Sequence, residues 1–286
     1  MKYAFIRDNA AAHSIVTLCR VLSVSSSGFY DWLDRPMSTT SVKNRQLTTK
    51  IRCFHKASND IYGAPRLQRD LSDDGEHVSR QRVSRLMKEA GIQSKVVKKF
   101  IVTTDSKATT KPAPDRLRRC FATPEPNQAW VADTTFVRTR KGWLFLAVVL
   151  DLYSRKIVGW SMSDRNNTKL VTDALTMAFW RRKVRSKIIV HSDRGSTYSS
   201  FSYRNLITAN DGLCSMSRKG DCYDNAVAES FFGSLKTELV DHEDYLTKEQ
   251  ARRSLFEYIE LFYNKRRRHS YLDYVSPEEY ERASCP

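Results

Sequence analysis

Three acidic residues stand where an α/β protein could bring them together. Asp133 lies in the alternating stretch WVADTTF, Asp193 ends the apolar stretch IIVHSD, and Glu229 lies in the helical pattern AVAESFFGSLKTEL. Carboxylates without a local basic partner repel each other, and a hard divalent cation such as Mg²⁺, or Mn²⁺ in its place, relieves that repulsion. Two ions held roughly 3.5–4 Å apart would activate an attacking oxygen and stabilise a leaving one. The residue types therefore predict phosphodiester chemistry.

Each acid also has an ordinary structural interpretation. Asp133 could be a strand-edge acid, Asp193 could cap the turn that Asp-Arg-Gly favours, and Glu229 could be an exposed helix residue. The helix argues for a function, because Glu229 and Lys236 point within about twenty degrees of each other, with Asn225 one turn below. Lys236 would suit a DNA phosphate as a point charge. This polar strip flanks an apolar stripe, which consists of Ala228, Phe231, Phe232, Leu235 and Leu239.

The charge of the chain indicates a polyanionic partner. Its 286 residues carry a formal charge of +16, and its pI is near 9.7. Residues 1–120 hold 23 Lys and Arg against 11 Asp and Glu, whereas the remaining residues hold 25 against 21. The stretch NKRRRHS at 264–270 adds a second basic cluster. Such an excess is typical of proteins that bind nucleic acid or an anionic membrane.

Membrane and extracellular functions are not favoured. No apolar run is long enough to cross a bilayer, the N-terminus lacks a signal-peptide core, and no convincing basic amphipathic helix is present. The six cysteines lie far apart without a CxxC pair, which predicts buried free thiols in a reducing compartment. We therefore expect a cytoplasmic protein that associates with the nucleoid when it binds DNA.

The first 120 residues are expected to be mainly helical and to contact DNA. Residues 1–36 contain two apolar helical patterns around the polar stretch SVSSS, the arrangement of a helix-turn-helix. Residues 41–92 predict a second helical unit, with one helix beginning at Ala64 and another capped by Ser79. Residues 93–120 are expected to be a basic linker. The outward cations of the last helix could contact phosphates or form an ordinary solvated face, and they are Arg80, Arg82, Arg85 and Lys88.

The pattern changes after the linker to that of an α/β core over 121–286. A strand is expected at 128–139, and two more within 143–163 around the turn DLYSR. Further helices and strands are expected at 167–183, 187–193, 200–211, 213–217, 222–240 and 247–264. This order predicts a mixed five-stranded sheet covered on both faces and matches the ribonuclease-H-like fold, although the pattern alone leaves other α/β folds open.

The motifs around the three acids resemble the Asp, Asp and Glu blocks of insertion-sequence transposases of the IS-three type. The blocks are WVADTTF, HSDRG and GDCYDNAVAESFFGSLKTEL; LCRVLSVSSSGFYDW, YGAPRL and YIELFYNKRRRHSYLDYVSPEEY extend the resemblance over nearly the whole chain. The resemblance implies a core similar to retroviral integrases, with Asp133, Asp193 and Glu229 as the metal-binding catalytic triad and Lys236 as a DNA contact. It also implies cleavage of one strand at the element's end, after which the freed 3′ hydroxyl attacks another phosphodiester.

The family also implies partners. In this family such a chain is usually the second of two overlapping reading frames, and the fused product adds a helix-turn-helix and a leucine zipper. No heptad zipper is visible here, so a first-frame product or a fusion with it is an expected partner, together with a homo-oligomer on DNA. The HSDRG block is usually followed by any residue and then Gln-Tyr, but Thr197 replaces that glutamine. We expect this change to affect packing or substrate positioning without abolishing activity.

Two alternatives stand beside a strand-transfer enzyme. One is a catalytically silent DNA-binding or regulatory product, against which the intact triad argues. The other is a ribonuclease-H-like nuclease or resolvase, which would need neither the helical units before the core nor the C-terminal block. Metal-dependent joining of DNA ends would separate the enzyme from both alternatives.

Overall fold

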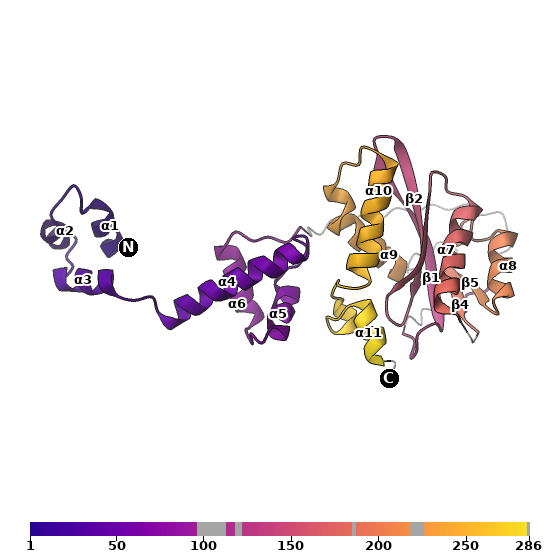
Figure 1. Ribbon diagram of the computed structural model, residues 1–286, viewed down its shortest axis with the longest axis horizontal. Coiled ribbons are helices and arrows are strands. Elements are labelled where there is room, and N and C mark those ends of the chain that lie inside the picture. Colours follow the sequence, from indigo (N-terminus) through magenta and orange to yellow (C-terminus); the bar gives the residue numbers. More distant parts are fainter. Residues whose placement is uncertain (96–112, 118–121, 185–186, 218–225, 285–286) are drawn as a thin grey trace.

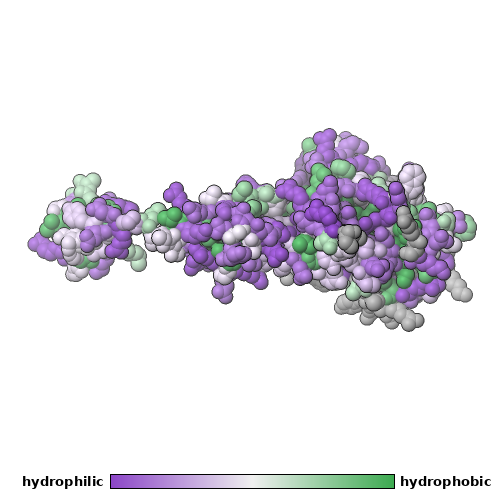
Figure 2. Space-filling model, turned by 60° about the horizontal axis from the view of Figure 1, so that its bottom comes forward, coloured by the Kyte–Doolittle hydropathy of each residue, from purple (hydrophilic) through white to green (hydrophobic). Residues whose placement is uncertain are grey.

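The chain is an elongated molecule in which helical units precede a larger α/β unit, as the computed structural model shows (Figure 1). The structure describes residues 1–95, 113–117, 122–184, 187–217 and 226–284. Within those ranges, none of the helices is long and apolar enough to cross a membrane. The face of the molecule seen in Figure 2 is mostly hydrophilic, with hydrophobic residues in small separate areas.

The first unit is a small helical cluster. It contains α1 (Lys2–Asn9), α2 (Ile15–Val21) and α3 (Ser26–Asp34). Ile6, Cys19 and Phe29 are buried between these helices and form a core of their own. Ser25 caps α3, because its hydroxyl accepts a hydrogen bond from Gly28 N at 3.4 Å. The two helices α2 and α3 lie on either side of the polar stretch as the sequence predicts, whereas α1 was not anticipated.

The second unit packs three helices around an aliphatic core. They are α4 (Thr39–Ala57), α5 (Ala64–Asp73) and α6 (Arg80–Glu89). Ser79 caps α6 as predicted, since its hydroxyl accepts from Arg82 N at 3.3 Å. Gly91 ends this helix at φ +68°, a conformation that glycine adopts without the Cβ penalty. Val83, Leu86 and Met87 form the buried stripe of α6.

The third unit is built on the mixed five-stranded sheet that the sequence predicts. Its strands are β1 (Ala129–Thr139), β2 (Gly142–Asp151), β3 (Ile157–Ser163), β4 (Ile189–Ser192) and β5 (Leu213–Met216). Their order is β3-β2-β1-β4-β5, with antiparallel pairing among β1, β2 and β3 and parallel pairing of β4 with β1 and β5. The short β4 and β5 are buried, as parallel strands usually are.

Helices cover both faces of this sheet (Figure 1). On one face lie α7 (Thr168–Arg182) and α8 (Phe201–Ala209), and on the other α9 (Ala226–Glu238), α10 (Lys248–Phe256) and the π-helix η3 (Glu257–Tyr263). α7 approaches β3 closely at Gly159, where a Cβ would lie 2.8 Å from Ala178 Cβ and meet the carbonyl oxygen of Ala174. Side chains on the two faces of β1 therefore enter two different hydrophobic clusters.

Several details differ from the sequence-based expectations. The chain continues through the short helices η2 (Val240–His242) and η4 (Ser270–Leu272) into α11 (Pro277–Ser284), which was not predicted. Within the stretch expected to be a linker, Ala113 and Leu117 are buried against the core, and Arg116 N donates to Ser215 Oγ at 2.9 Å. Cys19 is buried as expected, but the prediction of a buried thiol is wrong for Cys53, which is exposed on α4.

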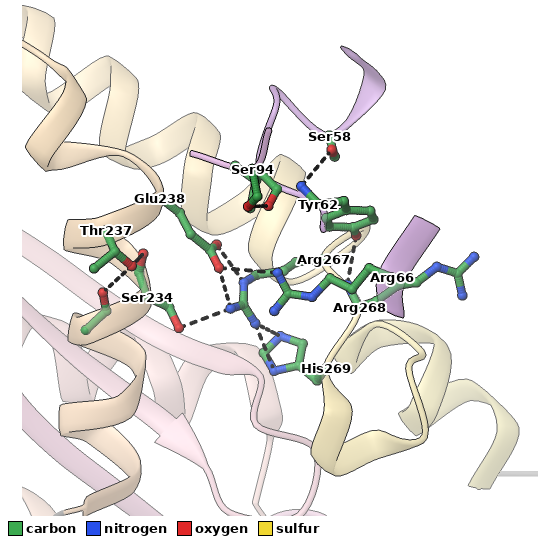
Figure 3. Close-up of polar contacts among 12 residues, drawn as sticks. Ser58, Tyr62, Arg66, Ser94, Ser234, Thr237, Glu238, Arg267, Arg268 and His269 are labelled. Carbon is green, nitrogen blue, oxygen red and sulfur yellow. Dashed lines mark hydrogen bonds and ion pairs between the residues drawn. The ribbon is translucent and has the colours of Figure 1, made fainter. Parts of the chain in front are cut away.

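A buried ion pair ties the end of α9 to the stretch after η3 (Figure 3). Arg267 Nε and Nη2 donate to the two carboxylate oxygens of Glu238 at 2.7 and 2.6 Å. The two side chains are only 7% and 3% exposed. Tyr258 Oη donates to the same carboxylate at 2.8 Å, and Arg66 of α5 lies 3.5 Å from it.

The neighbouring arginine joins the second helical unit to the core. Arg268 Nε donates to Asp70 at 2.6 Å and its Nη2 to Asp73 at 2.7 Å. Tyr62 Oη donates to the Arg266 carbonyl and accepts from Arg268 N, both at 2.9 Å. Arg267 and Arg268 of the predicted basic cluster therefore form internal contacts. Each is neutralised by acids that lie beside it in space but come from distant parts of the sequence.

Candidate active site

Asp133 and Asp193 meet at the carboxyl ends of neighbouring parallel strands. β1 and β4 pair in parallel as far as Ala132 and Ser192. The residue that follows each of these two is the acid, so the backbones of Asp133 and Asp193 continue side by side from strands about 4.8 Å apart, and the charge of Asp193 acts on Asp133. β4 ends there, whereas β1 continues to Thr139. The two acids therefore stand at an open edge of the sheet.

The carboxyl group of Asp133 is half-buried and faces other acids. Burial, followed by the charges of Asp193 and Glu229, raises its pKa to about 8. A hydrogen bond from Thr134 N to Asp133 Oδ1 at 2.7 Å and the charge of Lys236 act in the opposite direction on this pKa. A carboxyl group with such a pKa keeps its proton at neutral pH unless a cation replaces it.

A tight turn after β4 orients Asp193. Gly195 N donates to Asp193 Oδ1 at 2.8 Å, and a Cβ on Gly195 would lie 2.9 Å from the same oxygen. Burial raises the pKa of Asp193, although the bond from Gly195 opposes that rise. Beneath the turn, the buried His191 Nδ1 and Ser215 Oγ are 2.9 Å apart and link β4 to β5. Asp193 therefore caps the turn, as its ordinary structural interpretation predicts. The same position also keeps it beside Asp133.

The third acid comes from α9, which packs against β1. The apolar residues that α9 buries are Ala228, Phe231, Phe232 and Leu235, as the sequence predicts, while Leu239 after the helix is half-buried. Glu229 is exposed in the first turn, and partial desolvation raises its pKa. Lys236 lies two turns further on, with Nζ 5.6 Å from the centre of the Phe136 ring on β1. Asn225, the third member of the predicted polar strip, lies outside the described residues.

The donor set suits a hard divalent cation, but it is not assembled. Within the described ranges, no three His, Cys, Asp or Glu side chains gather closely enough to hold a metal ion. Asp133 and Asp193 adjoin, whereas Glu229 remains exposed. Carboxylate oxygens are ligands that Mg²⁺ prefers, and the raised pKa of Asp133 reflects repulsion that a cation would remove. The chemistry of the site therefore fits a metal, and binding would require Glu229 to approach.

The cations predicted to contact DNA from α6 are not equivalent. Arg80, Arg85 and Lys88 are exposed. Arg82 is partly buried, and its Nε and Nη2 both donate to Asn44 Oδ1 of α4, at 3.0 and 2.7 Å. Its guanidinium therefore holds α6 to α4, while the other three side chains are accessible to a ligand.

Sequence reasoning missed Tyr198, which is fully buried behind the acids. Burial, followed by the charge of Asp133, raises its pKa well above the usual value. Its ring meets that of Tyr203 edge to face at 5.1 Å. Thr197, the departure from the family pattern, is half-buried beside it, and its carbonyl accepts from Ser200 Oγ at 2.7 Å. Tyr198 is the tyrosine of the family block in which HSDRG is followed by any residue and then Gln-Tyr. That position could have indicated a buried residue that packs behind the acids.

Comparison with known proteins adds independent findings. Residues 123–222 and 229–284 match models of a family described as integrase core domain, and residues 42–100 match one described as HTH-like domain. Transposase InsF for insertion sequence IS3A from Escherichia coli (strain K12) is 41% identical over 283 residues, 98% of each chain. The insertion element IS600 uncharacterized 31 kDa protein from Shigella sonnei is 42% identical over 261 residues, 91% of this chain and 96% of that one.

The solved structures that the chain matches are more distant. The catalytic core domain of HTLV-2 integrase, solved in complex with magnesium, has a TM-score of 0.41 and 16% identity, covering 55% of this chain and 98% of that one. A chain of the simian T-cell lymphotropic virus intasome, solved with a PP2A regulatory subunit, has a TM-score of 0.47 and 13% identity, covering 81% of this chain and 74% of that one.

The sheet order and the family match together define an integrase-core protein, a polynucleotidyl transferase with the predicted ribonuclease-H-like architecture behind an all-helical region. The 41% identity over nearly the whole chain shows that it belongs to the family of IS3 insertion-sequence transposases. It is accordingly a DNA transposase, and this finding disfavours the alternative of a catalytically silent DNA-binding product.

Proposed function

We propose that this transposase cuts and joins DNA with Asp133, Asp193 and Glu229 as metal ligands of a DDE-type site. The observation that carries the proposal is the parallel register that sets Asp133 beside Asp193 at an open sheet edge. The influence of the Glu229 charge on the pKa of Asp133 supports the third position. Two Mg²⁺ ions are the expected cofactors, with Mn²⁺ as a substitute.

Each residue would have a separate task. A pair of divalent ions, when bound, supplies Lewis-acid activation of the attacking oxygen and stabilisation of the leaving oxygen. Asp133 would give up its proton and Asp193 would stay oriented by Gly195, so that both face the ions as carboxylates. Glu229 would complete the ligand set from α9. Lys236 would bind a phosphate of the DNA strand as a point charge.

Further DNA contacts follow from exposure and charge. The exposed Arg80, Arg85 and Lys88 of α6 would contact phosphates, and Arg82 would act mainly by holding α6 in place. Asn225 is a further proposed contact beside Glu229. The enzyme would act as a homo-oligomer on two element ends, together with a first-frame product or as a fusion with it, in the cytoplasm and on the nucleoid.

The decisive experiment is strand cleavage and joining on DNA that carries the element's own ends, with and without Mg²⁺. We expect the wild type to join ends only with the metal, and Asp193→Asn and Glu229→Gln to bind DNA but fail in both steps. Asp173→Asn is the matched control, because this carboxylate is paired with Lys169 on the surface of α7. Joining by Asp193→Asn at the wild-type rate would refute the ligand assignment.

A second outcome tests the proposed partner. If the wild type binds DNA without joining it, the first-frame region is added in trans or by fusion. Activity that appears only then, and is lost again with Glu229→Gln, would establish both the site and the partner. Joining by the chain alone would refute the requirement for the partner.

A further inference from the structure

The β1–β2 hairpin extends beyond the part of the sheet that β4 covers. β4 pairs with β1 only as far as Ala132 in the described part of the chain. Further along the hairpin, Phe136 lies opposite Phe145, and Arg138 lies opposite Trp143. Directly opposed residues share a face of the sheet, and alternate residues of one strand do so as well. Three aromatic side chains and an arginine therefore lie on one face of the hairpin.

The outer part of this aromatic face is open to solvent. Phe145 packs against the hydrophobic cluster that contains the buried residues of α7, but Phe136 is 53% and Trp143 49% exposed. The rings of Phe136 and Trp143 meet edge to face, with centroids 5.0 Å apart and planes at 82°. Such a contact orients both rings, so this surface is ordered before anything binds. Exposed aromatic surface of this kind indicates a binding site.

Positive charge surrounds the two rings. Lys236 Nζ lies 5.6 Å from the centre of the Phe136 ring, and Arg138 and Lys141 are exposed on the hairpin. None of these three cations forms an ion pair with another residue that the structure describes. Cations for phosphates and aromatic rings for bases are the combination that binds a single nucleic-acid strand. An acidic partner protein would use the charges but would have less use for the rings.

The distance from the proposed reaction centre decides which part of the DNA could reach the rings. Trp143 lies opposite Arg138, which is five residues beyond Asp133 on an extended strand, a separation of about 17 Å along the strand. Asp133 lies on the other face of β1, so a bound strand would pass around the edge of β1 that β4 leaves uncovered beyond Ala132. Nucleotides follow each other at about 3.4 Å along one strand of a duplex, so this separation corresponds to roughly five nucleotides. A base inside a duplex is stacked on its neighbours and cannot stack on a side chain.

We propose that Trp143, oriented by Phe136, stacks on an unpaired base about five nucleotides from the reacting phosphate. Lys236 and Arg138 hold the phosphates beside that base. This assignment rests on the proposed function, because Asp133 marks the position of the reacting phosphate. It gives the hairpin a role in holding a strand that is frayed at the element's end or distorted at the target.

The test is a binding measurement that needs no chemistry. The probes are a short duplex with a single-stranded extension that carries 2-aminopurine, and the same duplex without the extension, both measured in EDTA. The variants are Trp143→Ala, Trp143→Phe, which keeps an aromatic ring, and Trp180→Ala. Trp180 is a matched control, since it is 81% exposed on α7, away from the hairpin.

We expect the wild type to prefer the extended duplex and to quench the 2-aminopurine fluorescence. Trp143→Ala should weaken binding of the extended duplex roughly tenfold and abolish quenching, while binding of the blunt duplex is unchanged. Trp143→Phe should keep most of the preference, and Trp180→Ala all of it. Equal affinity of the wild type for both probes, or an equal loss on both with Trp143→Ala, would overturn the proposal.

Two further results distinguish base stacking by Trp143 from a protein interface at the same surface and from the proposed catalytic function. If Trp143→Ala changes the sedimentation of the free protein but not its preference between probes, the surface is a protein interface and the proposal fails. Repeating the binding series with Asp193→Asn separates stacking from catalysis. Persistent joining activity of Asp193→Asn would refute the proposed ligand set while the preference for the extension still supports stacking by Trp143.

Discussion

Replacing Arg267 by Met should destabilise the core strongly, because it leaves the carboxylate of Glu238 buried without its main partner. Glu238 is 3% exposed and receives two hydrogen bonds from Arg267. Burial alone would raise the pKa of Glu238, but the guanidinium outweighs burial and holds this pKa below its usual value. The pair therefore contributes stability at neutral pH that is lost as the pH falls through the pKa of folded Glu238.

The magnitude follows from the exposure of the two side chains. Removing one partner of a buried ion pair costs about 3–5 kcal/mol, and Arg66 at 3.5 Å can relieve only part of this cost. A core of this size loses roughly 2–4 °C of Tm for each kcal/mol, so we expect a decrease on the order of 10 °C. Arg140→Met is the matched control, since Arg140 pairs with Asp244 while both are well exposed, and it should change Tm far less than Arg267→Met.

Thermal unfolding followed by circular dichroism measures the effect. Combining Arg267→Met with Glu238→Gln removes the buried charge but keeps an acceptor for Tyr258, which donates to Glu238 at 2.8 Å. The double variant should therefore recover at least half of the lost Tm. Equal losses of Tm for Arg267→Met and Arg140→Met, or no recovery of Tm in the double variant, would refute the reasoning. Burial would then not determine how much the pair of Arg267 and Glu238 contributes to stability.

Three other predictions concern the site and the sheet. Because the pKa of folded Asp133 is about 8, above its unfolded value, its contribution to stability should fall as the pH rises from about 4 to 8 in EDTA. Melting curves should lose this slope in Asp133→Asn, and Mg²⁺ should raise Tm at pH 8 in the wild type only. Gly195→Ala should reduce strand cleavage at least tenfold with DNA affinity retained, because its Cβ would displace the Asp193 carboxylate; unchanged cleavage would contradict this role. Gly159→Ala should cost several kcal/mol, about 3, in urea unfolding, since the added methyl group forces β3 away from α7; a cost below about 1 kcal/mol would mean that the two elements shift freely.

Most elements of the core could be predicted because their patterns are local. Alternation marks β1, an apolar run marks β4, and the stripe from Ala228 to Leu235 marks α9. The three acids could be singled out for the same reason, since each interrupts or ends an otherwise apolar element. The parallel register that sets Asp133 beside Asp193 is a long-range fact, and it appears only when β4 pairs with β1.

The sequence by itself determined the residue types, the helical and extended periods and the net charge of +16, because these depend on neighbours along the chain. Only the tertiary structure decided how individual charges are used. Arg267 lies in a basic stretch, yet it is buried against Glu238, which lies 29 residues earlier at the end of α9. Trp143 reads like any apolar strand residue, yet it is exposed because the hairpin runs past the strands and helices that cover the rest of the sheet. Burial and pairing are properties of surfaces that meet in space, and folding brings together segments whose spacing in the sequence carries no trace of that contact.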